Sequence, residues 1–290
     1  MLVNEAMEAE MIQVGVGLRS AHYKAAMTPA SIDFVEVHAE NFFADGGVTH
    51  DILKAVGERY KISLHGTSLG LGSIHPPPLS HLQKFKRLVD NCSPFLISDH
   101  ACFSWSSEYG SPLHAGDLLP INFNEQTLGA MTNNVNRVQD LLGQQILIEN
   151  ISSYLPLQDT TIPETEFFNM LCHATGCGML LDVHNIQVNA VNRQSKQPLD
   201  DVLRFISELE IGNVRELHLA GIHDTTQDIW IDDHSGPISA DTWVVYTAAI
   251  NRFGSTPTLI EWDTKLPEWP NLVAEAMMAA SFATKVLESE

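Results

Sequence analysis

Eight short apolar runs rich in Val, Ile and Leu recur along the 290-residue chain, and longer stretches with helical periodicity separate them. The runs cover residues 13–18, 33–38, 61–65, 95–99, 145–150, 178–184, 214–219 and 257–262. Short apolar strands that alternate with helices are typical of a parallel sheet buried on both faces. Eight such units predict a (β/α)8 or TIM barrel.

The stretches between the runs predict helices at residues 51–59, 79–89, 125–142, 164–174, 199–208 and 240–253, with a closing helix at 269–287. The first connection, residues 22–32, has the weakest helical pattern. No linker or shift of composition divides the chain, so residues 1–290 are expected to form a single domain. Residues 1–12 have neither a basic segment nor a long apolar core, and we expect a flexible N-terminal segment rather than a secretory signal.

The formal charge of −20 restricts the classes of partner that the chain is expected to bind. With 36 Asp and Glu against 16 Lys and Arg, the surface should repel nucleic acid and anionic membrane surfaces. No apolar run approaches the roughly 20 residues that span a bilayer. The four cysteines form no CxxC pair and are expected to be reduced. These features predict a cytoplasmic protein.

Six of the eight predicted strands end in, or just before, a side chain that an apolar core would reject. These residues are His65, His100, Glu149, Asp182, His218 and Glu261. Successive members are 33 to 49 residues apart, which is about one β/α unit with insertions. Because all strands of such a barrel run the same way, their carboxyl ends meet at one rim, where barrel active sites are built.

Three imidazoles and three carboxylates at one rim are costly to desolvate unless a cation compensates them. More than four such ligands imply more than one ion, so we expect a cluster in which a carboxylate such as Glu149 bridges two metals. Asp232 and His234 follow the seventh strand with the D-x-H spacing that points two side chains to the same side of an extended segment. They predict a further metal position. Imidazole and carboxylate without thiolate suit iron, zinc or manganese alike.

Each residue alone also has a structural interpretation, because a single strand-end histidine is more often a hydrogen-bonded core residue than a ligand. The coincidence of eight positions is what favours the metal cluster. His38 and Glu40, at the end of the second strand, are further candidates for the pocket. The glycines between Gly66 and Gly72 fit plain turn geometry better than a phosphate cradle, because their spacing matches no P-loop or dinucleotide motif.

Ordered motifs between residue 13 and the C-terminus resemble the multinuclear non-haem iron-dependent oxidative enzymes, the family of the methanobactin-biosynthesis oxidase. The motifs are Gly15-Val-Gly17-Leu-Arg19, Glu36-Val-His38-Ala-Glu40-Asn41, Ser63-Leu-His65-Gly66, Ser98-Asp99-His100, Leu147-Ile-Glu149-Asn150, Leu181-Asp182-Val183, His218-Leu-Ala-Gly221 and Leu259-Ile-Glu261-Trp262-Asp263. The resemblance implies a xylose-isomerase-like barrel that holds two or three irons in mixed Fe2+ and Fe3+ states. It further implies dioxygen as co-substrate and a cysteine of a ribosomally made precursor peptide as the group that is modified.

Carried over to this sequence, the resemblance implies that His65, His100 and Glu149 bind one iron. Glu149, Asp182, His218 and Glu261 would bind the second, and Asp232 and His234 the third. For the remaining ligand of the third site the sequence offers Asn185, our first choice, or His184, which replaces the asparagine common in the family. Since no segment looks like an added peptide-binding domain, we expect a separate partner protein to recognise the peptide.

Two other functions fit the same ligands. The first is a metal-dependent hydrolase or sugar isomerase, because the ligand set also resembles the trinuclear zinc site of endonuclease-four-type phosphoesterases. Such an enzyme needs basic residues to grip phosphate, and Arg19 is the one cation that the sequence places near a strand end. The second is a non-catalytic metal-binding or scaffold protein.

Overall fold

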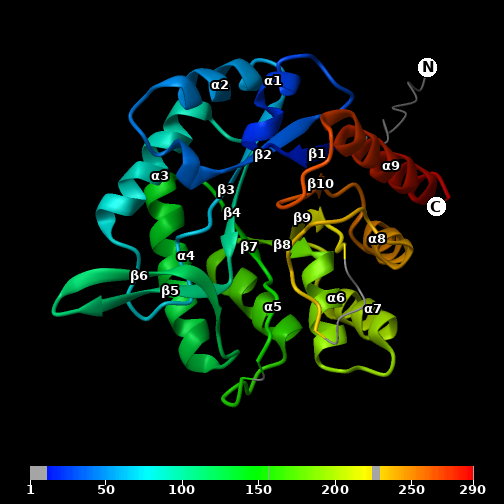
Figure 1. The fold of residues 1–290 in the computed structure, drawn as a ribbon. Coiled ribbons are helices and arrows are strands. Elements are labelled where there is room, and N and C mark those ends of the chain that lie inside the picture. The colour runs from blue at the N-terminus through cyan, green and yellow to red at the C-terminus, as the bar shows by residue number, and fades with distance from the viewer. Residues whose placement is uncertain (1–11, 156, 224–228, 290) are drawn as a thin grey trace, which may run out of the picture.

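Eight parallel strands close into a barrel in the order β1-β10-β9-β8-β7-β4-β3-β2 (Figure 1) in the computed structural model, which describes residues 12–155, 157–223 and 229–289. The barrel strands are β1 (Val14–Gly17), β2 (Phe34–His38), β3 (Lys61–His65), β4 (Leu96–His100), β7 (Leu147–Glu149), β8 (Gly178–Asp182), β9 (Val214–Leu219) and β10 (Thr258–Ile260). The predicted (β/α)8 barrel is therefore confirmed. Residues 1–11 of the expected flexible N-terminal segment lie outside the described residues.

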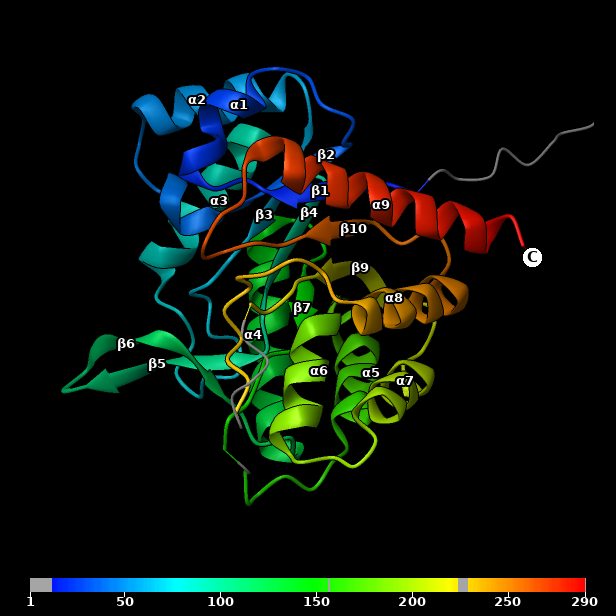
Figure 2. The same cartoon turned by 45° about the vertical axis from the view of Figure 1, so that its right-hand side comes forward.

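Helices surround the barrel on its outer side (Figures 1 and 2). They are α1 (Tyr23–Ala26), α2 (Val48–Gly57), α3 (Leu79–Cys92), α4 (Glu125–Leu142), α5 (Glu164–Thr175), α6 (Val183–Asn192), α7 (Pro198–Glu208), α8 (Ala240–Phe253) and α9 (Trp269–Leu287). Short 3-10 turns, η1 (Ser20–His22) and η2 (Ala39–Phe42), follow β1 and β2. The helix α9 packs against β1 and α8, and so joins the two ends of the described chain. None of the described helices is long and apolar enough to cross a membrane.

Capping residues explain why several helices begin and end as the sequence predicts. Asn124 caps α4 by accepting a hydrogen bond from the Thr127 amide (3.0 Å), and Ser239 caps α8 by accepting one from Thr242 (3.1 Å). Gly143 follows α4 in the left-handed conformation, with a φ of 71°. The bounds of α4, α8 and α9 agree with the predicted ranges.

The run at residues 178–184 is shorter as a strand than the sequence predicts. The strand β8 ends at Asp182, and α6 begins with the next residue. The cause is the Asp182 carboxylate, which accepts a hydrogen bond from the Asn185 amide (2.7 Å) and acts as the N-cap of α6. The apolar pattern of α6 was missed because it continues that of the strand without a break.

A two-stranded hairpin, β5 (Cys102–Glu108) and β6 (Ser111–Pro120), was also not predicted. It fills the long interval between β4 and α4 and extends away from the barrel (Figure 1). Its base is fixed by Ser73, whose hydroxyl accepts hydrogen bonds from the amides of Ser104 and Trp105 (both 2.9 Å). The first connection, with the weakest predicted helix, contains only one turn of helix, α1.

Candidate metal centre

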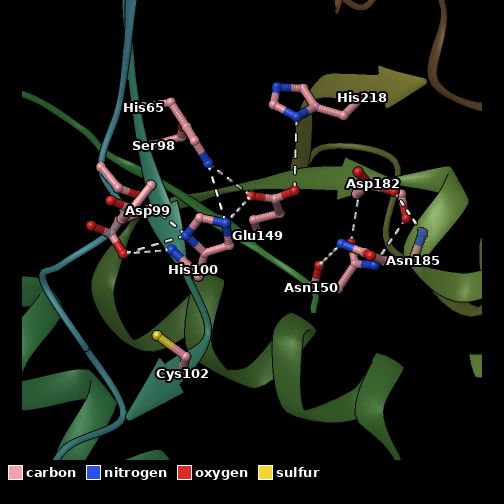
Figure 3. A network of polar contacts seen from close by, with 12 residues as sticks. His65, Ser98, Asp99, His100, Cys102, Glu149, Asn150, Asp182, Asn185 and His218 are labelled. Carbon is pink, nitrogen blue, oxygen red and sulfur yellow. Dashed lines mark hydrogen bonds and ion pairs between the residues drawn. The ribbon is translucent and has the colours of Figure 1, made fainter. Parts of the chain in front are cut away.

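The carboxyl ends of β3, β4 and β7 bring His65, His100 and Glu149 together (Figure 3). The Nε2 atoms of His65 and His100 lie 3.3 and 3.1 Å from Glu149 Oε2, and 3.2 Å from each other. At most 8% of each residue is exposed. Three ligand atoms from three strands therefore face one buried point, as the spacing along the sequence predicts.

The other nitrogen of each imidazole is held by a neighbouring group. His65 Nδ1 lies 2.8 Å from Ser98 Oγ, and His100 Nδ1 lies 3.1 Å from the carbonyl oxygen of Gly66. Because a carbonyl can only accept, His100 carries its proton on Nδ1 in the neutral form, which leaves the Nε2 lone pair free. A side chain at Gly66 would collide with Asp99, since an added Cβ would lie 2.3 Å from Asp99 Oδ2.

A second group of ligand atoms comes from Glu149, Asp182, His218 and Glu261, which all lie within 4.8 Å of one another. His218 Nδ1 is 3.1 Å from Glu261 Oε2 and 3.8 Å from Glu149 Oε1. Glu149 thus presents one oxygen to each group, with His65 and His100 on one side and His218 on the other (Figure 3). This is the geometry that a bridging carboxylate requires.

Asp232 and His234 form a third group in the loop after β9. His234 Nε2 lies 2.7 Å from Asp232 Oδ1 and 3.8 Å from Asp182 Oδ2, while His234 Nδ1 lies 3.2 Å from Glu261 Oε2. Gly221 permits this loop to fold back, because a Cβ there would lie 2.1 Å from the carbonyl oxygen of Pro237. The loop therefore reaches the rim at the side of Asp182.

Both candidates for the remaining position of the third group have a buried polar atom without a hydrogen-bond partner. For Asn185 the atom is Oδ1, and for His184 it is Nε2. The Asn185 amide nitrogen Nδ2 donates to the carbonyl of Asn150 (3.0 Å), which fixes Oδ1 as the free end. Asn185 lines the cavity of this site together with Asp232 and His234, whereas His184 is absent from the described lining.

Two buried carboxylates beneath the rim, Glu36 and Glu216, were not predicted as part of the site. Glu36 Oε2 lies 3.3 Å from His218 Nε2, and Glu216 Oε1 lies 3.9 Å from the same nitrogen. Neither residue is exposed, and both oxygens of Glu216 lack a partner. The signal in the sequence is their position, because Glu36 and Glu216 interrupt apolar strands two residues before His38 and His218.

Burial of so many ionisable groups perturbs their pKa values. Burial raises the pKa of Glu149 to about 8 and that of Asp182 to about 7. Burial lowers the pKa of His100, but the carboxylates of Glu149 and Asp99 outweigh it and raise the pKa to about 9. Burial likewise opposes the charged form of His218, whose pKa is nevertheless raised by Glu36 and Glu261. Protons held by the histidines and carboxyl groups thus compensate part of the buried negative charge.

This donor set fits bound metal ions. Asp182 Oδ2 and Asn185 Oδ1 face the site and lack a hydrogen-bond partner, while Glu149 Oε2 and the ring nitrogens of His234 contact only other members of the ligand groups and Asp263. Buried polar atoms normally have partners, so an orphaned set of imidazole and carboxylate atoms indicates ligands for a cation. Among the described residues, Arg19 is the cation beside these ligands, and it pairs with Glu261 Oε1 (3.1 Å) and with Asp263. Glu261 Oε2 remains in contact with His218 and His234.

The ligand groups open into a cavity of about 400 Å³. His38 lines it, as does Asp263, which the sequence analysis did not assign to the site. Glu40 has a different role, because its carboxylate accepts hydrogen bonds from the Thr67 amide (2.9 Å) and the Ser68 hydroxyl and so holds the β3–α3 connection. Gly70 and Gly72 lie against the start of β5, which agrees with turn and packing geometry.

Residues 13–284 match the family model described as RiPP precursor modification enzyme MbnB/TglH/ChrH, where RiPP denotes a ribosomally synthesised and post-translationally modified peptide. The chain belongs to this family. The MbnB/TglH/ChrH match covers every strand of the barrel and every ligand position described above. It confirms the resemblance of the sequence motifs and places the chain among enzymes that modify precursor peptides.

Curated relatives are similar over nearly the whole chain. A UPF0276 protein of Chromobacterium violaceum is 41% identical over 266 residues, which are 91% of this chain and 92% of the relative. A UPF0276 protein of Vibrio vulnificus is 41% identical over 271 residues, with 92% and 90% covered. These names describe no activity.

Solved structures show where the fold occurs elsewhere. D-psicose 3-epimerase from Clostridium cellulolyticum superposes with a TM-score of 0.60 at 13% identity, covering 95% of this chain and 99% of the epimerase. A xylose isomerase domain-containing protein from Salmonella typhimurium gives 0.60 at 14% identity, with 97% and 99% covered. Endonuclease IV from Thermus thermophilus gives 0.57 at 12% identity, with 94% and 99% covered. At these identities the likeness establishes the xylose-isomerase-like barrel and nothing about the reaction.

Proposed function

We propose that this member of the family is a multinuclear iron-dependent oxygenase or oxidase that uses dioxygen to modify a cysteine of its precursor peptide. The observation that carries the proposal is the convergence of two buried ligand groups on the two oxygens of Glu149. Family membership supplies the class of substrate, a ribosomally made peptide.

In this proposal His65, His100 and Glu149 would hold one iron, and Glu149 would also serve a second. Asp182, His218 and Glu261 complete the second position, while Asp232, His234 and Asn185 serve the third. When bound there, mixed Fe2+ and Fe3+ ions would supply a site for a soft thiolate sulfur and for dioxygen, the co-substrate. These nine residues are the ligand set predicted from the sequence.

The chain's own contribution is to orient these ligands. In three histidines, the ring nitrogen that faces away from the ligand groups contacts a neighbouring residue. The neighbour is Ser98 for His65, Gly66 for His100 and Glu36 for His218. Such contacts fix the ring and its tautomer and raise the basicity of the coordinating nitrogen. The cavity above the ligands has room for a side chain of the peptide, and we expect a separate partner protein to deliver that peptide.

A phosphoesterase on the same barrel fits the cavity less well. Its described lining contains no lysine or arginine, and Arg19 is already paired with Glu261 and Asp263. With a net charge of −20, the protein would repel a nucleic acid rather than attract it. A neutral sugar would not be repelled, so an isomerase is the stronger of the two rivals. A scaffold protein would bind metal without turnover.

The test is dioxygen consumption by protein purified without oxygen, with at least two irons per chain, upon addition of the cognate precursor peptide. We expect consumption in proportion to the peptide modified, as followed by mass spectrometry, and none with a Cys→Ser peptide. The variant Glu149→Gln should lose the activity, whereas His173→Ala, at an exposed histidine whose side chain is 62% accessible, should retain it. An iron-loaded protein that modifies the peptide without consuming dioxygen, or does neither, contradicts the proposal.

A further inference from the structure

A second cavity, of about 550 Å³, adjoins the metal-side cavity and contains none of the predicted ligands. The two cavities share five lining residues, Pro120, Ile151, Ser153, Tyr154 and Leu155. We call the second cavity the side chamber. It lies between the end of β6, the β7–α5 connection and α6, and Figures 1 and 2 both place that connection on the same side of the barrel as the hairpin.

The walls of the side chamber are mainly apolar. The aliphatic and phenyl side chains among the lining residues are those of Ala101, Pro120, Ile121, Phe123, Ile151, Leu155, Leu157, Ile162 and Pro163. A chamber of this size and character is typical of sites that take an apolar group of a ligand. Leu155 is 72% exposed and Tyr154 is 46% exposed, so large side chains at the junction of the two cavities present apolar surface to solvent.

Polar residues that line the chamber are largely engaged within the protein. The Asn189 side chain accepts from the Ser153 amide (2.7 Å) and donates to the Ile151 carbonyl (3.0 Å). Asn192 does the same with the backbone of Trp230 (2.8 and 3.0 Å). Glu164 and Arg193 face each other at 3.8 Å. A charged or strongly polar occupant would lose its hydration here and gain few hydrogen bonds in return.

Resting on the proposed function, we propose that the side chamber is a specificity subsite for a large apolar side chain, such as Leu, Ile, Met or Phe, of the precursor peptide. That residue lies within two positions of the modified cysteine. Because the two cavities share a wall, a cysteine in the metal-side cavity would place its sequence neighbours at the junction. Consecutive Cα atoms are about 3.8 Å apart, so a residue one or two positions away is near enough to enter the side chamber. Burial of one such side chain is expected to raise affinity roughly 10- to 100-fold over a polar residue.

The experiment uses a peptide array, because the natural peptide is not needed to test the subsite. Synthetic decapeptides carry a fixed central cysteine, and each of the two positions on either side is varied through all residues. Metal-loaded protein is bound to the array without oxygen. We expect at least a 10-fold preference for large apolar residues over Asp or Ser at one of these positions.

Two variants and a control assign that preference to the chamber. Ile162→Trp fills the chamber without adding charge, and Ile162→Asp adds a charge to its wall; both should abolish the preference. Ile211→Asp, at a 58% exposed isoleucine between α7 and β9, makes the same chemical change elsewhere and should leave it intact. Metal content and melting temperature confirm that each variant is folded.

A native protein with no preference at the flanking positions, or a preference that survives in folded Ile162→Trp, overturns the assignment of the chamber. A parallel array with serine in place of the central cysteine separates this result from the proposed function. If the cysteine and serine arrays bind equally well, cysteine is not the target and the proposed function is contradicted. A preference for apolar flanking residues that persists in both arrays would still support the apolar subsite.

Discussion

Glu36 and Glu216 are two buried glutamates beneath the same histidine, and their positions suggest different roles. Glu36 Oε2 is the nearer to His218 Nε2, at 3.3 Å against 3.9 Å, and also accepts from Ser63 Oγ (3.4 Å). Burial raises the pKa of Glu216 well above its ordinary value, which favours the neutral form of this side chain. Glu36 therefore positions His218, whereas Glu216 mainly fills space.

Replacement of Glu36 by Gln should weaken metal binding about 10- to 100-fold, the usual cost of removing a carboxylate that holds a metal-binding histidine. The matched variant Glu216→Gln should change metal affinity little, because an amide resembles a protonated carboxyl group. Competition between the metal-free protein and a chelator for Fe2+ measures both. Equal losses in the two variants, or no loss in Glu36→Gln, would show that Glu36 does not position His218.

At the scale of the elements, the N-terminus of α5 contains a carboxyl group with an unusual environment. Glu164 is 12% exposed, and burial raises its pKa from 4.5 to about 7 despite the nearby Arg193. The folded state thus holds its proton to higher pH than the unfolded state. Stability from this group is complete below pH 4.5, falls as pH rises, and is lost above about pH 7.

The variant Glu164→Gln should therefore be more stable than the native protein at pH 8, because it removes the buried charge. The expected gain is on the order of 2 kcal/mol, since the helix N-terminus stabilises the carboxylate and offsets part of its burial cost. At pH 4 the two proteins should have equal stability. Urea denaturation at both pH values gives the comparison. A native protein that is more stable than the variant at pH 8 would mean that the Arg193 contact outweighs burial.

Individual elements differed in how far the sequence predicted them. The helices α4 and α8 have clear capping residues and were predicted with correct bounds, while β8 and α6 share one apolar pattern that periodicity alone cannot divide. The β5–β6 hairpin was missed because its strands are mostly exposed on both faces, so they lack the alternation that identifies a half-buried strand. Its base nevertheless shapes the cavity through Pro120.

For the whole molecule, the direction of the strands explains why the site could be predicted from the sequence. Parallel strands of one barrel must end at a common rim, so polar side chains one β/α unit apart were expected to meet, and all nine predicted residues lie there. Glu36, Glu216 and Asp263 were missed because their role depends on distances across the barrel. The side chamber was missed for the same reason, since its walls come from segments far apart in the sequence.

The central claim, a cluster of two or three irons bridged by Glu149, is tested most directly by metal analysis with Mössbauer spectroscopy. The protein is purified without oxygen from iron-supplemented cells, beside His100→Ala and Glu149→Ala variants. We predict two or three irons per chain with a mixed-valence signal that both variants lose. Zinc or manganese alone, unaffected by iron supply, would contradict the oxidative account and favour hydrolase or isomerase chemistry on the same barrel.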